Sequence, residues 1–219
     1  MKIILFGATG MVGQGVLREC LLDPGVERVL AVGRGATGQR NPRLEELRHD
    51  DFLDFSAIES RLSGYDACFF CLGVTSVGLT EERYRHLTYG ITMAAATTLA
   101  KLNPQMVFVY VTGRGTDSTE RGRVMWARVK GKTENDLLKL PFKAAYMFRP
   151  AGIQPLHGIR SKTAWYQAAY VVAAPLLTFL NKVAPQYMTT TEQVGRAMLA
   201  VARHGYPKPV LESGDINRL

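Results

Sequence analysis

The sequence predicts an α/β fold in which a parallel sheet is covered by helices on both faces. Short apolar runs alternate along the chain with segments whose apolar residues recur at helical spacing, the pattern of successive strand–helix units. The first run, residues 2–6, leads without a gap into a glycine-rich turn and then into a helix. The length of 219 residues suits a single domain with a substantial core.

The individual elements follow from composition and from the residues that end them. The expected strands are short apolar or alternating runs at residues 2–6, 27–32, 44–48, 67–72, 105–111 and 143–148. The expected helices are residues 14–22, 55–62, 81–102 and 125–140, of which the longest ends at Asn103-Pro104. Polar, glycine-rich residues 35–43 form a loop.

The chain becomes less regular after Pro150, so we divide the single domain into a core, residues 1–150, and a C-terminal part, residues 151–219. We expect the C-terminal part to supply the substrate side of the cleft, because ligands of such folds lie beyond the carboxyl ends of the strands. Residues 189–202 form a closing helix with a capping-box start, in which a threonine precedes Glu192.

The glycine-rich turn GATGMVG predicts a dinucleotide site and, with it, a Rossmann-type doubly wound sheet. A glycine at the turn adopts backbone angles that other residues resist, a second lets the backbone approach a pyrophosphate, and a third lets helix and strand pack closely. The phosphates would then meet the free N–H groups at the start of the helix. The residues expected at the pyrophosphate are Gly7, Thr9, Gly10, Met11, Val12 and Gly13.

The end of the second strand favours NADP over NAD. An NAD site usually has an acidic residue there, about twenty residues beyond the glycines, to bond the ribose hydroxyls. This chain has Gly33-Arg34 instead, and an arginine can bind a 2′-phosphate through a charge-assisted hydrogen bond. Arg40 and Arg43 are candidate helpers. The alternative is that Arg34 is a solvated loop residue.

Charge and cysteine content restrict the partners. The net charge of +8 suits an anionic ligand, and a phosphorylated cofactor is a simpler partner than nucleic acid, because the basic residues are dispersed and no nucleic-acid motif occurs. A nucleic-acid or membrane adaptor is a weaker alternative that predicts steep salt dependence of binding. With no recognisable signal peptide and three cysteines, too few for a disulfide framework, we expect a cytoplasmic protein.

Several segments together resemble a known family. GATGMVGQGVLRECL, AVGR, CLGVTS, VKGKTE and FRPAGI are similar to the Tat-interacting-protein-like branch of the extended and atypical short-chain dehydrogenase/reductase superfamily, whose bacterial members are often labelled NAD-dependent epimerase/dehydratase. The resemblance covers the whole chain and is strongest over residues 1–152. It implies an NADP-binding Rossmann fold in which Asp51 and Phe52 contact the adenine and the Cys71-Leu72-Gly73 turn passes the ribose.

The resemblance also exposes a departure at the expected catalytic residues. The superfamily uses Tyr-x-x-x-Lys, in which the tyrosine transfers a proton and the lysine holds the nicotinamide ribose. Here Lys130 matches the lysine, but Trp126 takes the place of the tyrosine, and an indole N–H does not titrate usefully. Thr112 is the nearest match to the superfamily's catalytic Ser/Thr, although Gly113 is the alternative in the adjacent register.

Two functions therefore remain open. The favoured one is an oxidoreductase or epimerase that transfers a hydride on a small carbonyl or sugar-like substrate, with a proton donor elsewhere: Tyr84, Tyr89, Tyr166 or a water held by Lys130. The alternative is a protein that binds NADP without redox turnover and regulates a protein partner as a sensor or scaffold, with Trp126 covering the nicotinamide.

The remaining motifs favour structural roles. Cys68 and Cys71 form a C-x-x-C pattern, but residues three apart on a strand point to opposite faces, which favours packing over a metal or redox site. The histidines lack metal-ligand spacing. Basic residues between Arg114 and Lys132 form a solvated face or bind an anion. The apolar stretch 164–180 is short for a membrane span and packs on the core, lines the substrate pocket, contacts a membrane surface or makes a homodimer contact.

Overall fold

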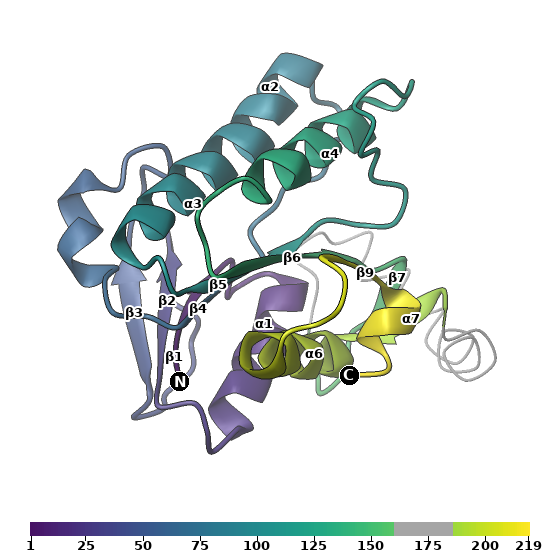
Figure 1. The fold of residues 1–219 in the computed structure, drawn as a ribbon. Helices are drawn as coiled ribbons and strands as arrows, with labels where there is room; N and C mark the ends of the chain where they lie inside the picture. Colours follow the sequence, from purple (N-terminus) through teal and green to yellow (C-terminus); the bar gives the residue numbers. More distant parts are fainter. Residues whose placement is uncertain (160–185) are drawn as a thin grey trace.

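The centre of the molecule is a seven-stranded parallel sheet. A computed structural model describes residues 1–159 and 186–219 (Figure 1). The strands lie in the order β3-β2-β1-β4-β5-β6-β9, with every pair parallel. Their bounds are β1 (Lys2–Phe6), β2 (Arg28–Gly33), β3 (Leu44–Arg48), β4 (Ala67–Phe70), β5 (Val107–Val111), β6 (Ala144–Arg149) and β9 (Val210–Glu212). This strand order, which reverses between β1 and β4, confirms the predicted Rossmann-type doubly wound fold.

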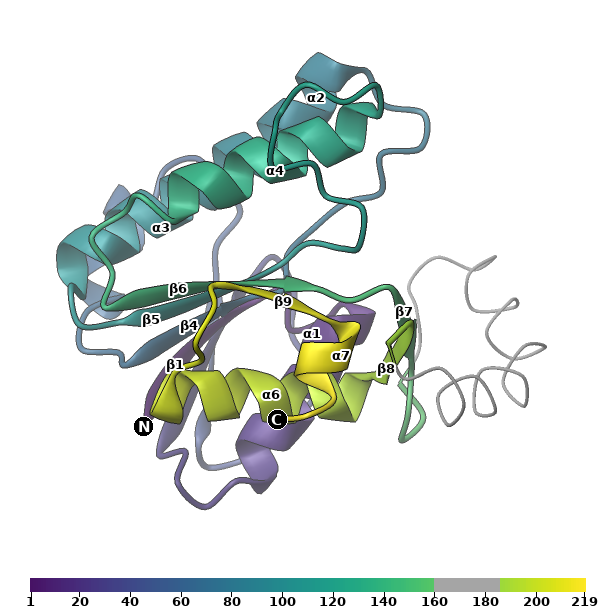
Figure 2. The ribbon, with the colours of Figure 1, turned by 45° about the vertical axis from the view of Figure 1, so that its right-hand side comes forward.

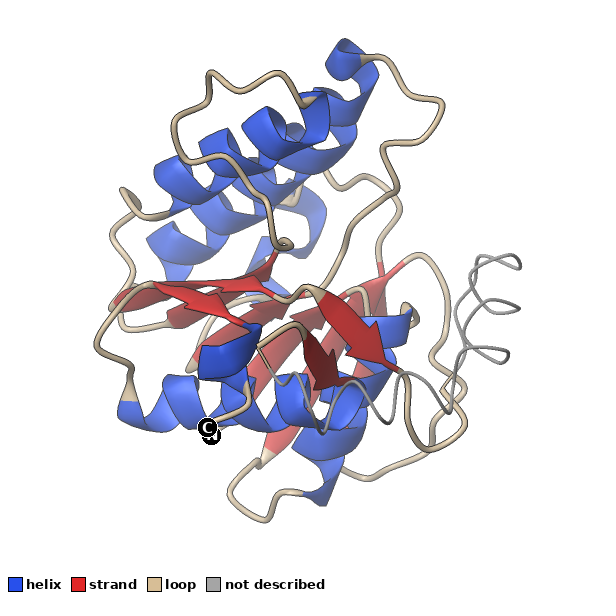
Figure 3. Cartoon of the chain, turned by 90° about the vertical axis from the view of Figure 1, so that its right-hand side faces the viewer, coloured by secondary structure: helices blue, strands red, loops and turns tan. Residues whose placement is uncertain are grey.

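Helices cover both faces of the sheet, as Figures 2 and 3 show. One face carries α1 (Met11–Leu22) and α6 (Thr191–His204). The opposite face carries η1 (Ser56–Arg61), α2 (Glu81–Arg85), η2 (His86–Gly90), α3 (Ile91–Leu102) and α4 (Met125–Leu137). A small second sheet pairs β7 (Gly152–Gln154) with β8 (Met188–Thr190), and the short helix α7 (Ser213–Ile216) follows β9.

The alternation of side chains along each strand divides the core into two layers. Ile3 and Leu5 pack with α1 and α6, whereas Ile4 and Phe6 pack on the side of α3. Because both faces of a parallel sheet are buried, its strands are continuous apolar runs, and this is why the sequence pattern identified them. Cys68 lies in the layer of Ile4, while Cys71 packs against the layer of Ile3, so their side chains are on opposite faces.

Several elements differ from the prediction. The single helix expected over 81–102 contains a π-helical turn, η2, between α2 and α3. The cap of α6 is Thr190, whose hydroxyl accepts a hydrogen bond from Gln193 N at 3.0 Å; the Gln193 side-chain oxygen makes no return bond, so the predicted capping box is a simple threonine cap. Strand β9 was not predicted, because its three residues are too few to show a periodic pattern.

Some predictions concern residues outside the described part. The apolar stretch 164–180, with Trp165, Tyr166 and Tyr170, falls within residues 160–185, which the structure does not describe. Within residues 1–159 and 186–219, no helix is long and apolar enough to cross a membrane. The same residues contain no cluster of three or more histidine, cysteine or acidic side chains suited to a metal ion.

Candidate functional site

The glycine turn between β1 and α1 depends on two glycines for its shape. Gly7 has φ +78°, and a Cβ on it would lie 2.6 Å from Leu72 N, so only glycine lets the turn approach the chain that follows β4. A Cβ on Gly13 would lie 2.0 Å from Gly7 O, so this glycine lets α1 start directly against the turn. At Gly10 an added Cβ would meet Gly7 O at 3.4 Å, an ordinary contact.

The start of α1 is arranged to receive an anion. Gly10 is the N-cap and offers no side-chain cap, so the first amides of the helix, including those of Met11, Val12 and Gly13, point out of its end. The Gln14 side chain donates to Thr9 O at 3.1 Å and fastens the turn to the helix. Together with the positive end of the helix dipole, these amides form a cradle suited to a pyrophosphate.

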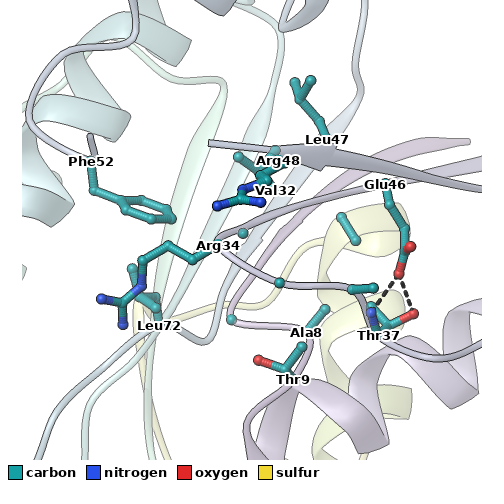
Figure 4. A pocket seen from close by; sticks show the side chains of 15 residues that line it. Ala8, Thr9, Val32, Arg34, Thr37, Glu46, Leu47, Arg48, Phe52 and Leu72 are labelled. Atoms are coloured by element: carbon teal, nitrogen blue, oxygen red, sulfur yellow. Dashed lines mark hydrogen bonds between the residues drawn. The ribbon is translucent and has the colours of Figure 1, made fainter. Parts of the chain in front are cut away.

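A cavity of about 510 Å³ extends from this cradle along the carboxyl ends of β1, β2 and β3 (Figure 4). The glycine turn lines it with Gly7 and Thr9, and the ends of β2 and β3 contribute Arg34 and Arg48. A neighbouring cavity of about 220 Å³ shares Arg34, Phe52 and Leu72 with the first and adds Asp51 and Gly73. The structure therefore brings together predicted site residues from four separate segments of the chain.

The charges at the larger cavity are mostly unbalanced. Within the described part of the chain, Arg34 has neither a hydrogen bond nor an ion pair, and Arg48 has only an exposed contact of 3.4 Å with Asp50. Glu46 also lines the cavity, but its carboxylate accepts hydrogen bonds from Thr37 N and Thr37 Oγ1, both at 2.5 Å. Arg48 and Glu46 were not predicted from the sequence. They are two residues apart on β3 and therefore lie on the same face of the strand, but the sequence does not indicate whether that face lines the cavity.

The structure does not support Arg40 and Arg43 as helpers of Arg34. The Arg43 guanidinium donates to the carbonyl oxygens of Asp23 at 2.7 Å and Val26 at 2.8 Å, and also to Leu21 O, so it anchors the end of α1. Arg40 lines a different cavity of about 450 Å³ beside α1. Both corrections have the same cause: proximity in a polar loop does not determine which way a long side chain turns.

Two of the residues expected near the adenine and the ribose, Asp51 and Cys71, have local partners. The Asp51 carboxylate accepts a hydrogen bond from Leu53 N at 2.9 Å and lines only the smaller cavity. Cys71 lines neither cavity; its N–H donates to Phe6 O at 3.0 Å, and burial raises the pKa of its thiol. Cys71 therefore contributes backbone shape beside Gly7.

Thr112 belongs to a buried network at the end of β5. Its hydroxyl donates to Glu134 Oε1 at 2.6 Å and lies 3.2 Å from Phe148 O. Glu134, on α4, is 1% exposed and forms an ion pair with Arg149, whose Nε lies 3.1 Å from both carboxylate oxygens. The hydroxyl predicted to be catalytic is thus committed to an internal carboxylate.

Lys130 and Trp126 lie one helical turn apart on α4. The Lys130 ammonium donates to Thr112 O at 3.0 Å, and burial lowers the pKa of Lys130 to about 8 against the opposing effect of Glu134. The Trp126 ring packs over Gly115, where an added Cβ would lie 3.5 Å from it. Lys130 thus lies beside the end of β5, with Trp126 one turn earlier on α4.

Two of the alternative proton donors, Tyr84 and Tyr89, line neither cavity. Tyr84 is 1% exposed within α2, and burial raises the pKa of its hydroxyl. The Tyr89 hydroxyl donates to Asp136 Oδ2 at 2.9 Å, and its pKa is raised by burial and by that carboxylate. Tyr166 lies outside the described residues. The structure thus does not bring Tyr84 or Tyr89 to Lys130.

A further pair lies beyond the ends of β5 and β6. The Arg114 guanidinium stacks 4.4 Å from the ring centre of Tyr187, which is half-exposed. The backbone holds both residues there, since Arg114 N donates to Pro150 O and Gly152 N donates to Tyr187 O. Sequence gave no indication of this pair, because the two residues are distant along the chain and share no motif.

No family model matches the chain, but curated relatives do. Protein FMP52, mitochondrial, from Candida albicans is 26% identical over 157 residues, which cover 70% of this chain and 67% of the relative. Protein FMP52-2, mitochondrial, from Scheffersomyces stipitis is 28% identical over 148 residues, covering 67% and 63%. The Meyerozyma guilliermondii protein FMP52, mitochondrial, is 24% identical over 224 residues, covering 100% and 94%.

These relatives contradict the expected cytoplasmic location, because fungal proteins similar to this chain are named as mitochondrial. The expectation rested on the cysteine content and on the lack of a recognisable secretory signal, and neither bears on mitochondria. The chain spans about two thirds of the length of the first two relatives. Their names state no activity.

Solved structures show the class of protein to which the fold corresponds. The Bordetella bronchiseptica enzyme WbmF in complex with NAD+ has a TM-score of 0.69 at 14% identity, covering 99% of this chain and 76% of WbmF. UDP-N-acetylglucosamine 4-epimerase from Methanobrevibacter ruminantium has a TM-score of 0.70 at 14% identity, covering 96% and 75%. The chain therefore has the fold of epimerase/dehydratase-type short-chain dehydrogenase/reductase enzymes, which confirms the resemblance at the level of the fold.

Proposed function

We propose that this protein binds NADP(H) and acts as an oxidoreductase or epimerase, transferring a hydride on a small carbonyl or sugar-like substrate. The observation that carries the proposal is the cavity between the glycine cradle and Phe52, which is lined by two arginines. Among the described residues that line it, the only carboxylate is that of Glu46, which already accepts hydrogen bonds from Thr37. Two cations at the adenosine end favour a cofactor with an additional phosphate.

The residues present fit such a cofactor along its length. The α1 cradle would hold the pyrophosphate, Phe52 and Leu72 would contact the base, and Lys130, whose ammonium donates to Thr112 O, would also donate to the nicotinamide ribose. The bound cofactor would supply the hydride donor or acceptor. WbmF is in complex with NAD+, and the structural neighbour from Methanobrevibacter ruminantium is a UDP-N-acetylglucosamine 4-epimerase. Both support the class of chemistry without distinguishing NADP from NAD.

Lys130 is the group on α4 that can supply the proton, because the indole of Trp126 does not titrate. With a pKa of about 8, its ammonium is largely charged at neutral pH and gives up a proton more readily than an ordinary lysine. As hydride reaches the carbonyl carbon, the ammonium or a water held by it gives a proton to the carbonyl oxygen. The resulting amine recovers a proton from solvent.

The two positions expected to carry catalytic hydroxyls favour a second function. The Thr112 hydroxyl is bonded to Glu134 inside the protein, and the tyrosine position holds Trp126. Both departures suit a protein that binds NADP without turnover and whose occupancy regulates a protein partner. The Trp126→Tyr variant separates the two functions: a large gain in NADPH-dependent reduction over a panel of carbonyl and nucleotide-sugar substrates supports the enzyme, and no gain supports the regulator.

The first test is calorimetric titration of the full chain with NADPH and with NADH. We expect NADPH to bind at least about tenfold more tightly than NADH, since one charge-assisted hydrogen bond contributes about 1.5–3 kcal/mol. Equal affinities would contradict the preference for NADP. Absence of binding by both would overturn the proposed function and leave the glycine turn a purely architectural feature.

A further inference from the structure

We propose that the two arginines divide the recognition of the adenosine half of the cofactor: Arg48 binds the 2′-phosphate, and Arg34 stacks on the adenine. This inference rests on the proposed binding of NADP(H). It reassigns the phosphate from Arg34, the residue that the sequence predicts, to a residue of the third strand that no motif indicates.

The position of Arg34 suits a flat base better than a phosphate. Its side chain extends from the end of β2 toward Phe52 and Leu72 (Figure 4). It lines the larger and the smaller cavity, and the smaller one is otherwise walled largely by apolar side chains such as Leu53 and Ile91. A planar guanidinium stacks well on a nucleobase, and an apolar wall opposes burial of a phosphate.

The position of Arg48 suits the phosphate. Arg48 pairs with Gly33 across β2 and β3, so no side chain from that partner stands between it and the cavity. In Figure 4 its guanidinium points into the cavity beside Val32. Its contact with Asp50 is long and exposed, with Arg48 78% and Asp50 64% exposed, and such pairs contribute little. The five N–H donors of the Arg48 guanidinium are therefore available to a phosphate group.

Glu46 removes a competing mode of binding. In NAD sites a carboxylate near the end of the second strand accepts bonds from the ribose hydroxyls. Glu46, two residues before Arg48 on β3, is the carboxylate that could do so, but it holds Thr37 of the loop that follows Arg34. The Glu46–Thr37 contact thus positions this loop, and it engages the carboxylate that could otherwise accept hydrogen bonds from the ribose hydroxyls of NAD.

The test is calorimetry of the full chain with NADPH, NADH, 2′,5′-ADP and 5′-AMP, comparing the wild type with Arg48→Ala and Arg34→Ala. For Arg48→Ala we expect a loss of about 10- to 100-fold in affinity for NADPH and 2′,5′-ADP, and NADH and 5′-AMP within about twofold. For Arg34→Ala we expect all four ligands to weaken by a similar factor of about 5 to 30.

The matched control is Arg83→Ala, on α2 beside a different cavity, which should bind all four ligands as the wild type does. Because Arg34, Arg48 and Arg83 are all exposed, thermal melting should show intact folding in each variant. A loss of NADH affinity in Arg48→Ala as large as that of NADPH, or a loss confined to the phosphorylated ligands in Arg34→Ala, overturns the division of roles alone. A wild type that binds neither dinucleotide overturns the proposed function as well.

Discussion

At the residue scale, the most consequential side chain is Lys130. It lies half-buried on α4 with its ammonium on Thr112 O, and Glu134 close by is already neutralised by Arg149. Burial therefore outweighs the favourable effect of Glu134, and the pKa of Lys130 falls to about 8. A lysine in this state is costly to the folded protein when charged and is poised to exchange a proton near neutral pH.

This shift predicts a pH-dependent stability. Between about pH 8 and pH 10.5 the folded protein binds fewer protons at Lys130 than the unfolded chain does, so the free energy of unfolding rises with pH across that window. Relative to Lys130→Met, which cannot titrate, we expect the wild type to gain up to about 3 kcal/mol between pH 7 and pH 10.5. Urea unfolding at a series of pH values measures the difference.

Lys132 provides the matched control on the same helix. Its hydrogen bond to Asp136 raises the pKa of Lys132, so its charge stabilises the folded protein at all pH values below the unfolded pKa. The difference between wild type and Lys132→Met should therefore stay flat from pH 7 to pH 10. A flat profile for Lys130→Met as well would show that the Lys130 ammonium is solvated, and would remove the argument for it as proton donor.

At the scale of elements, glycines bring the helices α1 and α6 into close contact. A Cβ on Gly15 would lie 2.5 Å from Thr191 Cβ and 2.7 Å from Thr191 O, and a Cβ on Gly195 would lie 2.8 Å from Glu19 Cγ. Each helix thus presents a glycine to the other. Because α1 also carries the cofactor cradle, this contact sets the position of the candidate site.

Gly15→Ala should therefore destabilise the protein. Alanine improves helix propensity by about 1 kcal/mol, but the added methyl must displace α6 backbone, and such overpacking costs about 1–3 kcal/mol or more. We expect a lower midpoint of urea unfolding and weaker NADPH binding, measured on the same preparation. Gly35→Ala is the control for stability, since nothing lies within 4 Å of an added Cβ there. Unchanged stability in Gly15→Ala would show that the two helices separate easily.

The secondary-structure elements also show which features the sequence patterns predict and which they do not. Strands β1, β2 and β5 were found because their buried side chains make unbroken apolar runs. The π-helical turn η2 was missed, because one wider turn leaves helical spacing almost unchanged. Strand β9 was missed because it is defined by its pairing with β6, as in the register of Phe148 with Leu211, and not by its own three residues.

At the scale of the whole molecule, the candidate site lies where the strand order reverses. Strands β1 and β4 are neighbours from which the chain continues toward opposite edges of the sheet. The glycine cradle and the two cavities lie at the carboxyl ends of strands on one side of this point, and Lys130 lies beyond it, at the carboxyl end of β5. The net charge of +8 favours anionic ligands for the chain as a whole.

Binding of NADPH should consequently stabilise the whole folded protein against unfolding. If NADPH binds only the folded chain, a concentration of 100 times its dissociation constant adds about 2.7 kcal/mol to the free energy of unfolding. We expect a higher melting temperature with NADPH than with the same concentration of NADH, and a smaller difference at high salt, where charged contacts are screened. Equal shifts with both cofactors would contradict a role for Arg48 in choosing between them.

The sequence by itself determined the layer architecture and the position of the glycine cradle. Both follow from local physics: buried parallel strands require apolar runs, and a turn this tight at Gly7 and Gly13 tolerates no Cβ. Only the tertiary structure decided the side-chain partnerships, such as Thr112 with Glu134, Arg43 with the end of α1, and Arg48 facing the cavity. These depend on which segments meet across the fold, and a long polar side chain can turn to any of several partners within its reach.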